Sequence, residues 1–294
     1  MTTSVDRPVR GEADSPPPRS TVATTISASA RGSLLSYARE LLRFRDLFYF
    51  LVRRDIKVRY AQTILGFGWA ILQPFSQMIV FSIFFGALAG ISSAGVPYPV
   101  FSMAAVVPWT YFANAVAAGS TSLIGSAGIV SKVYFPRLLV PLAPIGAGII
   151  DFAIGIGLLA VVMAAYGLVP SAVAIVATPV LVLAAAMAAA SFSIWLSVLG
   201  VQYRDVRYIT PFLLQLMLFV TPVIYVVSKV PEWIRPFYSI NPMVGVIGGF
   251  RSAFLGIGPM PYGSIATSFI VSSILLVTGL LYFRRVERVF ADIA

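Results

Sequence analysis

The stretch from Ser171 to Val201, SAVAIVATPVLVLAAAMAAASFSIWLSVLGV, decides the fold. It runs for 31 residues without a charged side chain. A helix needs about 20 mainly apolar residues to cross the hydrocarbon core of a bilayer. The stretch therefore predicts a transmembrane helix.

The same composition extends over most of the chain. Of the 294 residues, 59% are hydrophobic and 11% are charged, whereas about 25% of the residues of a soluble domain are charged. Residues 65–283 contain only seven Lys/Arg and three Asp/Glu. This segment is typical of a membrane unit with several spans.

We expect an all-α membrane protein with six transmembrane helices. The expected spans are residues 67–88, 100–118, 138–168, 171–201, 209–227 and 265–283. Between the fifth and sixth spans, the apolar pieces are too short to cross. One of them, INPMVGVIGGFRSAFLGIG (240–258), is predicted to enter the bilayer as a re-entrant helical hairpin buried in protein.

The regions outside the spans differ in character. Residues 1–33 lack the apolar core of a signal peptide and are expected to form a disordered cytosolic tail. Residues 34–64 predict a basic amphipathic helix in the membrane surface, or, less favoured, a helix packed on a cytosolic partner. The transmembrane domain covers residues 65–285, and residues 286–294 form a second cytosolic tail.

Six spans place both termini on one side of the membrane. With the termini in the cytoplasm, 18 of the 21 Lys/Arg lie on that side, and only Lys229, Arg235 and Arg251 lie outside. Basic residues favour the cytoplasmic side. We therefore expect both termini in the cytoplasm.

Several classes of chemistry are excluded. The chain has no cysteine or histidine, which excludes disulfides, thiol catalysis and the usual zinc ligands. A GxxxxGK[ST] loop for ATP is absent, because Lys57, Lys132 and Lys229 do not follow glycine. The net charge of +10 comes from residues that flank spans, so we expect membrane lipid and not nucleic acid as a partner.

Asp151 lies within the third expected span. An acid at this depth is costly and indicates a function. It is either a proton site or a structural acceptor for a hydroxyl, an amide or an arginine on a neighbouring helix. The structural interpretation is favoured, because the spans contain no second acid or histidine for a proton relay.

The loop SKVYFPRLLVP (131–141) follows the second expected span. Its aromatic pair Tyr134-Phe135, between Lys132 and Arg137, is suited to a groove on a partner protein. The same residues are also typical of a basic span flank with interfacial aromatics. The residues alone leave both interpretations open.

Five motifs occur in a characteristic order. They are RYAQTILGFGWAILQP (59–74), VPWTYF (107–112), KVYFPRLLVP (132–141), YRDVRYITPFLLQLMLFVTPVIY (203–225) and NPM (241–243). With them the chain resembles the membrane subunit of ABC-2 type exporters, over about residues 45–285. The similar branch exports lipid-linked polysaccharides such as O-antigen, galactan and wall teichoic acid.

The resemblance implies a homodimer that pairs with two ATPase subunits, which would bind the ATP and Mg²⁺. It also implies that the loop docks on the ATPase as a short coupling helix. The expected coupling residues are Lys132, Val133, Tyr134, Phe135, Pro136 and Arg137, with Arg204 and Asp205 as a lesser contact. In this interpretation the chain is a transport subunit of the bacterial plasma membrane and not an enzyme.

The implied substrate is a polyisoprenyl-diphosphate-linked polysaccharide, which needs aromatic faces for sugars and cations for the diphosphate. The candidates for the glycan path are Trp69, Phe75, Phe81, Trp109, Tyr111 and Phe112. Those for the headgroup entrance are Arg53, Arg54, Lys57, Arg59 and Tyr60. Packing of the aromatics and contact of the cations with phospholipid are the alternatives.

Two other functions remain open at this stage. One is an ABC-2 permease for a drug or another small molecule. The other is a proton-coupled secondary transporter that uses Asp151, which would need no ATPase.

Overall fold

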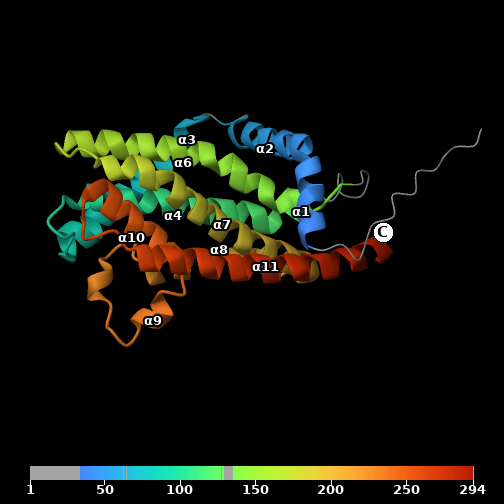
Figure 1. Cartoon of the computed structure of the whole chain (residues 1–294). Coiled ribbons are helices and arrows are strands. Elements are labelled where there is room, and N and C mark those ends of the chain that lie inside the picture. The colour runs from blue at the N-terminus through green and yellow to red at the C-terminus, as the bar shows by residue number, and fades with distance from the viewer. Residues whose placement is uncertain (1–33, 62, 64, 127, 129–134, 294) are drawn as a thin grey trace, which may run out of the picture.

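The computed structural model describes residues 34–61, 63, 65–126, 128 and 135–293. Within these ranges every regular element is a helix. Figure 1 shows the long helices running side by side as one bundle. The all-helical class predicted from the sequence is confirmed.

Among the described residues, five helices are long and apolar enough to cross a membrane. The first is α3 (Gly68–Phe81) with its continuation η1 (Ser82–Leu88). The others are α4 (Tyr98–Gly125), α6 (Leu139–Ala165), α7 (Ala172–Gln202) and α11 (Tyr262–Ile293), in which the candidate span is Tyr262–Glu287. Exposed aliphatic side chains such as Val161, Ile175 and Ile270 cover their outer faces. The outer surface of the bundle is therefore apolar, as expected for a surface in contact with lipid.

The fifth expected span, 209–227, differs from the helix found there. Helix α8 (Val206–Val220) has 15 residues, which corresponds to about 22 Å and is shorter than the hydrocarbon core of about 30 Å. The helix ends because Thr221 precedes Pro222 and takes an extended conformation with ψ 145°. A sixth crossing at this position stays a prediction.

Helix α10 (Pro242–Leu255) occupies the segment expected to be re-entrant. The Asn241 side chain caps its start by accepting a hydrogen bond from the Met243 backbone N–H, and Gly256 ends it with φ +66°. It packs along α11 so closely that a Cβ on Gly245 would lie 2.2 Å from the Ser264 carbonyl oxygen. Its 14 residues are too few to cross a bilayer.

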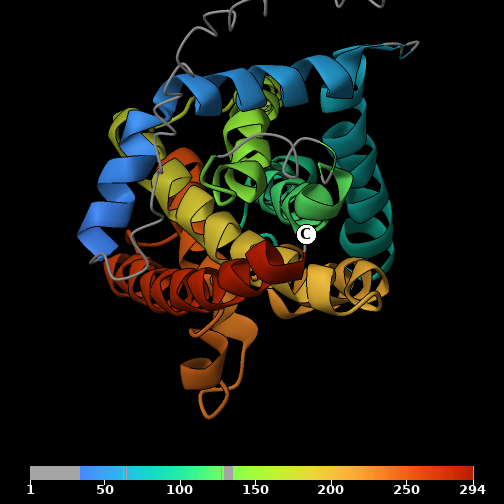
Figure 2. The same ribbon diagram turned by 90° about the vertical axis from the view of Figure 1, so that its right-hand side faces the viewer.

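Between α8 and α10 the chain forms a lobe outside the bundle. The lobe contains the short helices η2 (Val227–Lys229) and α9 (Arg235–Tyr238). In Figures 1 and 2 it projects below the bundle. Inside the lobe, Val230 and Tyr238 are buried with Val244 of α10.

Helix α4 forms the centre of the bundle. It packs against α3, α6, α7, α8 and α10, and Phe101 and Phe112 on it are fully buried. Gly119 permits the close crossing with α7, because a Cβ there would lie 2.5 Å from Ser193 Oγ. Small residues at helix crossings are typical of packing within membranes.

The expected amphipathic segment 34–64 forms two helices, α1 (Leu34–Arg43) and α2 (Arg45–Tyr60), with a break at Phe44. Both lie across the end of the bundle at which α11 ends (Figures 1 and 2). Leu51 is buried on α2 and packs with Leu139 and Ala143 of α6. The segment is therefore anchored to the spans, while its depth in a membrane stays a prediction.

Arg251 is a buried charge, which the sequence did not indicate, while its predicted place on the outer side of the membrane stays a prediction. It lies on α10 and is 4% exposed. Its guanidinium donates hydrogen bonds to the carbonyls of Pro222 (2.6 Å), Val223 (2.7 Å) and Tyr225 (2.9 Å). It also lies over the Phe101 ring, 3.6 Å from its centroid. These carbonyls follow the end of α8, so Arg251 joins the α8 end to α10 and α4.

The Arg251 contacts predict a large effect on stability. Arg251→Met would leave buried carbonyls without partners and should lower the free energy of unfolding by about 3 kcal/mol or more. Thermal unfolding of the detergent-solubilised chain measures the loss. Arg204→Met is the control, since Arg204 is exposed in the turn between α7 and α8 and its replacement should change little. Equal shifts in the two variants would contradict the role of Arg251.

Candidate functional site

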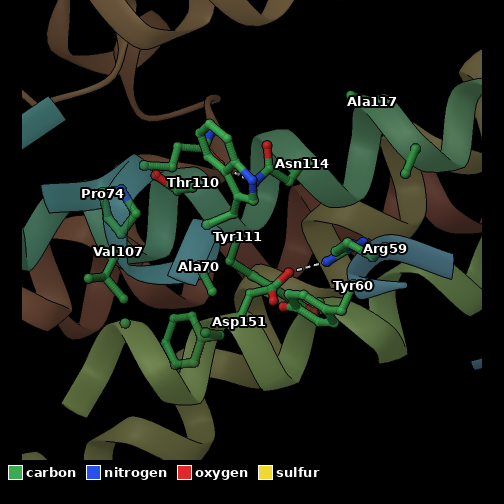
Figure 3. A pocket seen from close by; sticks show the side chains of 16 residues that line it. Arg59, Tyr60, Ala70, Pro74, Val107, Thr110, Tyr111, Asn114, Ala117 and Asp151 are labelled. Carbon is green, nitrogen blue, oxygen red and sulfur yellow. Dashed lines mark hydrogen bonds and ion pairs between the residues drawn. The ribbon is translucent and has the colours of Figure 1, made fainter. Parts of the chain in front are cut away.

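A cavity with several polar side chains on its walls opens between α3, α4 and α6, beside the end of α2. It has a volume of about 490 Å³. Figure 3 shows its lining side chains, which comprise Arg59, Tyr60, Trp69, Ala70, Gln73, Pro74, Val107, Thr110, Tyr111, Asn114, Ala117, Ala118, Gly148, Asp151, Phe152 and Gly155. We call it the α3–α6 pocket.

An ion pair between Arg59 and Asp151 lies at one side of this pocket (Figure 3). Arg59 comes from the last turn of α2, where a cation is favoured by the helix dipole. Asp151 comes from the middle of α6. Their side chains are 27% and 18% exposed. The pair is the arrangement expected if Asp151 is a structural acceptor for an arginine, and it neutralises the acid that a proton relay would need.

The walls of the α3–α6 pocket also carry uncharged polar groups among mainly apolar side chains. Asn114 donates a hydrogen bond of 3.2 Å to the Gln73 side-chain oxygen, which joins α4 to α3. Pro74 has no N–H, so the hydrogen bond from position 74 to the Ala70 carbonyl cannot form. Gln73 and Asn114 were not among the site residues predicted from the sequence. The sequence could have indicated them, because polar amides are unusual inside apolar spans.

The aromatic residues expected on the glycan path separate into two groups. Trp69 and Phe75 on α3 are 52% and 38% exposed. In contrast, Phe81, Trp109, Tyr111 and Phe112 are at most 8% exposed and lie in the hydrophobic core. Tyr111 reaches the α3–α6 pocket, but its hydroxyl donates to the Ile145 carbonyl. In this structure Phe81, Trp109 and Phe112 pack between helices, and their place on a glycan path stays a prediction.

The cations expected at the headgroup entrance also separate. Arg54 donates to the neighbouring Asp55 carboxylate at 2.9 Å, and Arg59 pairs with Asp151. Arg53 and Lys57 are exposed on α2. Tyr60 stacks on Phe67 with ring centroids 4.0 Å apart. Only Arg53 and Lys57 of the four cations therefore present an exposed charge.

The expected coupling loop is described in part. Lys132, Val133 and Tyr134 lie outside the described residues, so their prediction stands untested. Phe135 is 6% exposed and packs in a cluster with Leu123 of α4, Ile194 of α7 and Phe283 of α11. Its ring packs in the interior of the chain in this structure, and its contact with a partner stays a prediction.

The rest of that loop is also turned toward the chain itself. Pro136 is buried. The backbone N–H of Arg137 donates a hydrogen bond to the Glu287 carboxylate on α11, and the Arg137 guanidinium also attracts this carboxylate. These contacts fix the segment between Phe135 and α6 against the end of α11.

Arg204 and Asp205 lie in the turn between α7 and α8, and both are exposed. The turn is flanked by Tyr203 and Tyr208, which are 61% and 81% exposed. From the sequence, Arg204 and Asp205 were predicted to make a lesser contact with the ATPase, and the two tyrosines were not predicted. We call residues 203–208 the α7–α8 turn.

Comparison with known families decides the class of the chain. The pattern of the family described as "ABC-2 type transporter" matches residues 46–255. The chain belongs to the ABC-2 type transporter family. The match includes α2, the α3–α6 pocket, the α7–α8 turn and α10, so the features described above lie within this ABC-2 transporter domain.

Curated relatives of this ABC-2 transporter are similar over most of their length. An O-antigen export system permease protein RfbA from Klebsiella pneumoniae is 27% identical over 84% of this chain and 95% of its own. The protein of the same name from Myxococcus xanthus is 30% identical over 75% and 85%. The polysialic acid transport protein KpsM from Escherichia coli is 22% identical over 70% and 80%.

The Arg59–Asp151 pair predicts coupled effects on stability. Arg59→Gln and Asp151→Asn should each lower the melting temperature, because each leaves a half-buried charge unpaired. The double variant should recover part of the loss, with a coupling energy of about 1 kcal/mol or more. Thermal unfolding of the four proteins measures this cycle. Strictly additive losses would show that the two side chains do not interact.

Proposed function

We propose that this chain is the transmembrane subunit of an exporter that moves lipid-linked polysaccharide across the bacterial plasma membrane. The observation that carries the proposal is its similarity to three proteins named for O-antigen export or polysialic acid transport, over 70–84% of this chain. The same similarity favours a polysaccharide over a drug as the cargo. The chain itself makes and breaks no bond in this proposal.

The energy would come from ATPase subunits on separate chains. This sequence has no GxxxxGK[ST] loop, so in an ATP-driven complex the nucleotide and Mg²⁺ bind elsewhere. Two copies of this chain would pair with two ATPase subunits. The α7–α8 turn supports such docking, because it presents two exposed tyrosines beside Arg204 and Asp205, and partner surfaces are enriched in tyrosine.

The membrane arrangement that we propose keeps six crossings and cytoplasmic termini. The segment of α8 and the residues after it would complete the sixth crossing, buried against protein where it is not helical. Helix α10 would lie in the outer part of the bilayer and lead outward to the start of α11, which would then cross to the cytoplasm; Gly248 of α10 lies beside Pro261, which directly precedes α11. Helices α1 and α2 would lie at the cytoplasmic surface, where their basic residues meet anionic lipid.

The substrate path would form where two copies meet along α3 and α8. These helices present exposed aromatic rings, with Phe75 and Trp69 on α3 and Phe212 and Phe219 on α8. Aromatic faces suit the apolar faces of sugar rings. The diphosphate of the polyisoprenyl anchor would meet the exposed cations Arg53 and Lys57 at the entrance.

The proposal predicts a phenotype in the cell. Deletion of the gene should remove the polysaccharide from the cell surface while lipid-linked polymer accumulates inside, because synthesis continues without export. Surface staining of intact cells and extraction of the membrane lipids measure both pools. Unchanged surface polysaccharide in the deletion strain would reject the function.

A second prediction separates coupling from stability. When the chain is co-purified with its ATPase, Tyr134→Ala should lower ATPase recovery several-fold without changing the melting temperature. Phe135→Ala should instead destabilise the chain by about 3–5 kcal/mol, because it removes a buried ring. Tyr166→Ala is the matched control, since Tyr166 is 49% exposed at the other end of α6. Normal recovery with the Tyr134 variant would remove the loop from the interface.

A further inference from the structure

The α3–α6 pocket has an unusual feature that export by a channel between two copies does not use. Five buried side-chain atoms of the described residues lack a hydrogen-bond partner. Three of them belong to residues on the walls of this pocket, namely Tyr60 Oη, Thr110 Oγ1 and Asp151 Oδ1. A buried polar atom without a partner costs free energy, so its accumulation in one place indicates a site that a polar ligand completes.

The other polar groups of the pocket match the same kind of ligand. Gln73 and Asn114 present amide groups at the wall, and both are also accessible from outside. The Ala70 carbonyl lacks its bond to position 74. Together with the hydroxyls of Tyr60 and Thr110, these groups offer both donors and acceptors. A ligand with several hydroxyl groups can satisfy them all, because each hydroxyl donates one hydrogen bond and accepts others.

The charges of the pocket favour a neutral ligand. Arg59 and Asp151 are the only charged residues among the 16 that line it, and they pair with each other. A diphosphate in the pocket would meet the Asp151 carboxylate, and a cation would meet the Arg59 guanidinium. This balance places the anionic headgroup elsewhere and disagrees with the expectation that Arg59 binds it.

One wall of the pocket is aromatic. The Trp69 indole is 52% exposed at the start of α3. Aromatic rings offer a flat apolar surface, which suits the C–H face of a sugar ring while the pocket's polar groups reach its hydroxyls. A second cavity of about 430 Å³ lies further along α3 and α6 and is mainly apolar. Its polar side chains are Ser82, whose hydroxyl already bonds to the Met78 carbonyl, and Tyr166. Of these two cavities, the α3–α6 pocket is therefore the one whose walls carry several polar groups.

We propose that the α3–α6 pocket of each subunit binds a neutral sugar unit, with Trp69 against the ring and Tyr60, Thr110 and Asp151 on its hydroxyls. The sugar belongs either to the exported glycan or to a glycolipid of the membrane, since both present the same groups. The inference rests on the proposed function only for the first source.

Removal of single hydroxyls tests the site. Thr110→Val and Tyr60→Phe delete an unpartnered buried oxygen, so the melting temperature should stay the same or rise. Polymer export should nevertheless fall about threefold to tenfold for each variant, as expected for one lost ligand hydrogen bond. Thr178→Val is the matched control, because the Thr178 hydroxyl already bonds to the Ala174 carbonyl within α7. Export equal to that of the control in both variants would overturn the site.

Photo-crosslinking identifies the occupant directly. The full chain with Trp69→p-benzoylphenylalanine, expressed with its ATPase, should form an adduct that carries sugar, whereas Ile270→p-benzoylphenylalanine on the outer face of α11 should not. Loss of the adduct in a strain that makes no polymer assigns the sugar to the exported glycan. Persistence there assigns it to a glycolipid and still supports a sugar site. An adduct with phospholipid alone, or none, overturns the proposal.

The export function and the sugar site can be rejected separately. If deletion of the gene leaves the surface polysaccharide unchanged, the export function is rejected, whatever the crosslinks show. If deletion removes the polysaccharide but Thr110→Val and Tyr60→Phe export it normally, the function stands and the sugar site is rejected.

Discussion

The ion pair between Arg59 and Asp151 is the interaction on which the site depends. Asp151 lies in the middle of α6, where an unpaired carboxylate would be costly, and Arg59 reaches it from the last turn of α2. The pair therefore fixes the end of the amphipathic segment against a span. It also cancels the charge of the α3–α6 pocket, which makes the pocket suitable for neutral hydroxyl groups. One contact thus determines both how α2 is anchored and what the pocket can bind.

The two ends of the bundle are stabilised by different means. At one end, Phe135 and Arg137 tie the start of α6 to α7 and α11. A partner that moves the preceding loop would therefore move several helices together, as coupling to an ATPase requires. Toward the other end, the Arg251 guanidinium binds the carbonyls left free beyond α8. These hydrogen bonds satisfy backbone carbonyls that water does not reach. The short helix α8 and the irregular segment after it can therefore lie beside the spans.

The proposed sugar pocket and the proposed path between two copies both use α3. Trp69 and Phe75 stand on exposed parts of this helix, while its other side faces α4 and α6. A sugar held at Trp69 would therefore lie next to the surface along which the polymer moves. Such a position allows the pocket to orient a terminal or passing sugar, and a weak site is sufficient because a polymer that binds tightly at every unit would not advance.

The sequence by itself determined the helical class, the membrane environment, the family resemblance and most of the spans, because hydropathy and motif order are local properties of the chain. It also identified Asp151 as unusual and an arginine as one possible partner. It did not show that Phe135 is buried and Tyr208 is exposed, or that Arg251 lies in the interior with three carbonyls around it. These facts depend on which helices meet. The same aromatic or basic residue packs inward or faces a partner according to neighbours that are distant in sequence, and only the tertiary structure decides which neighbours those are.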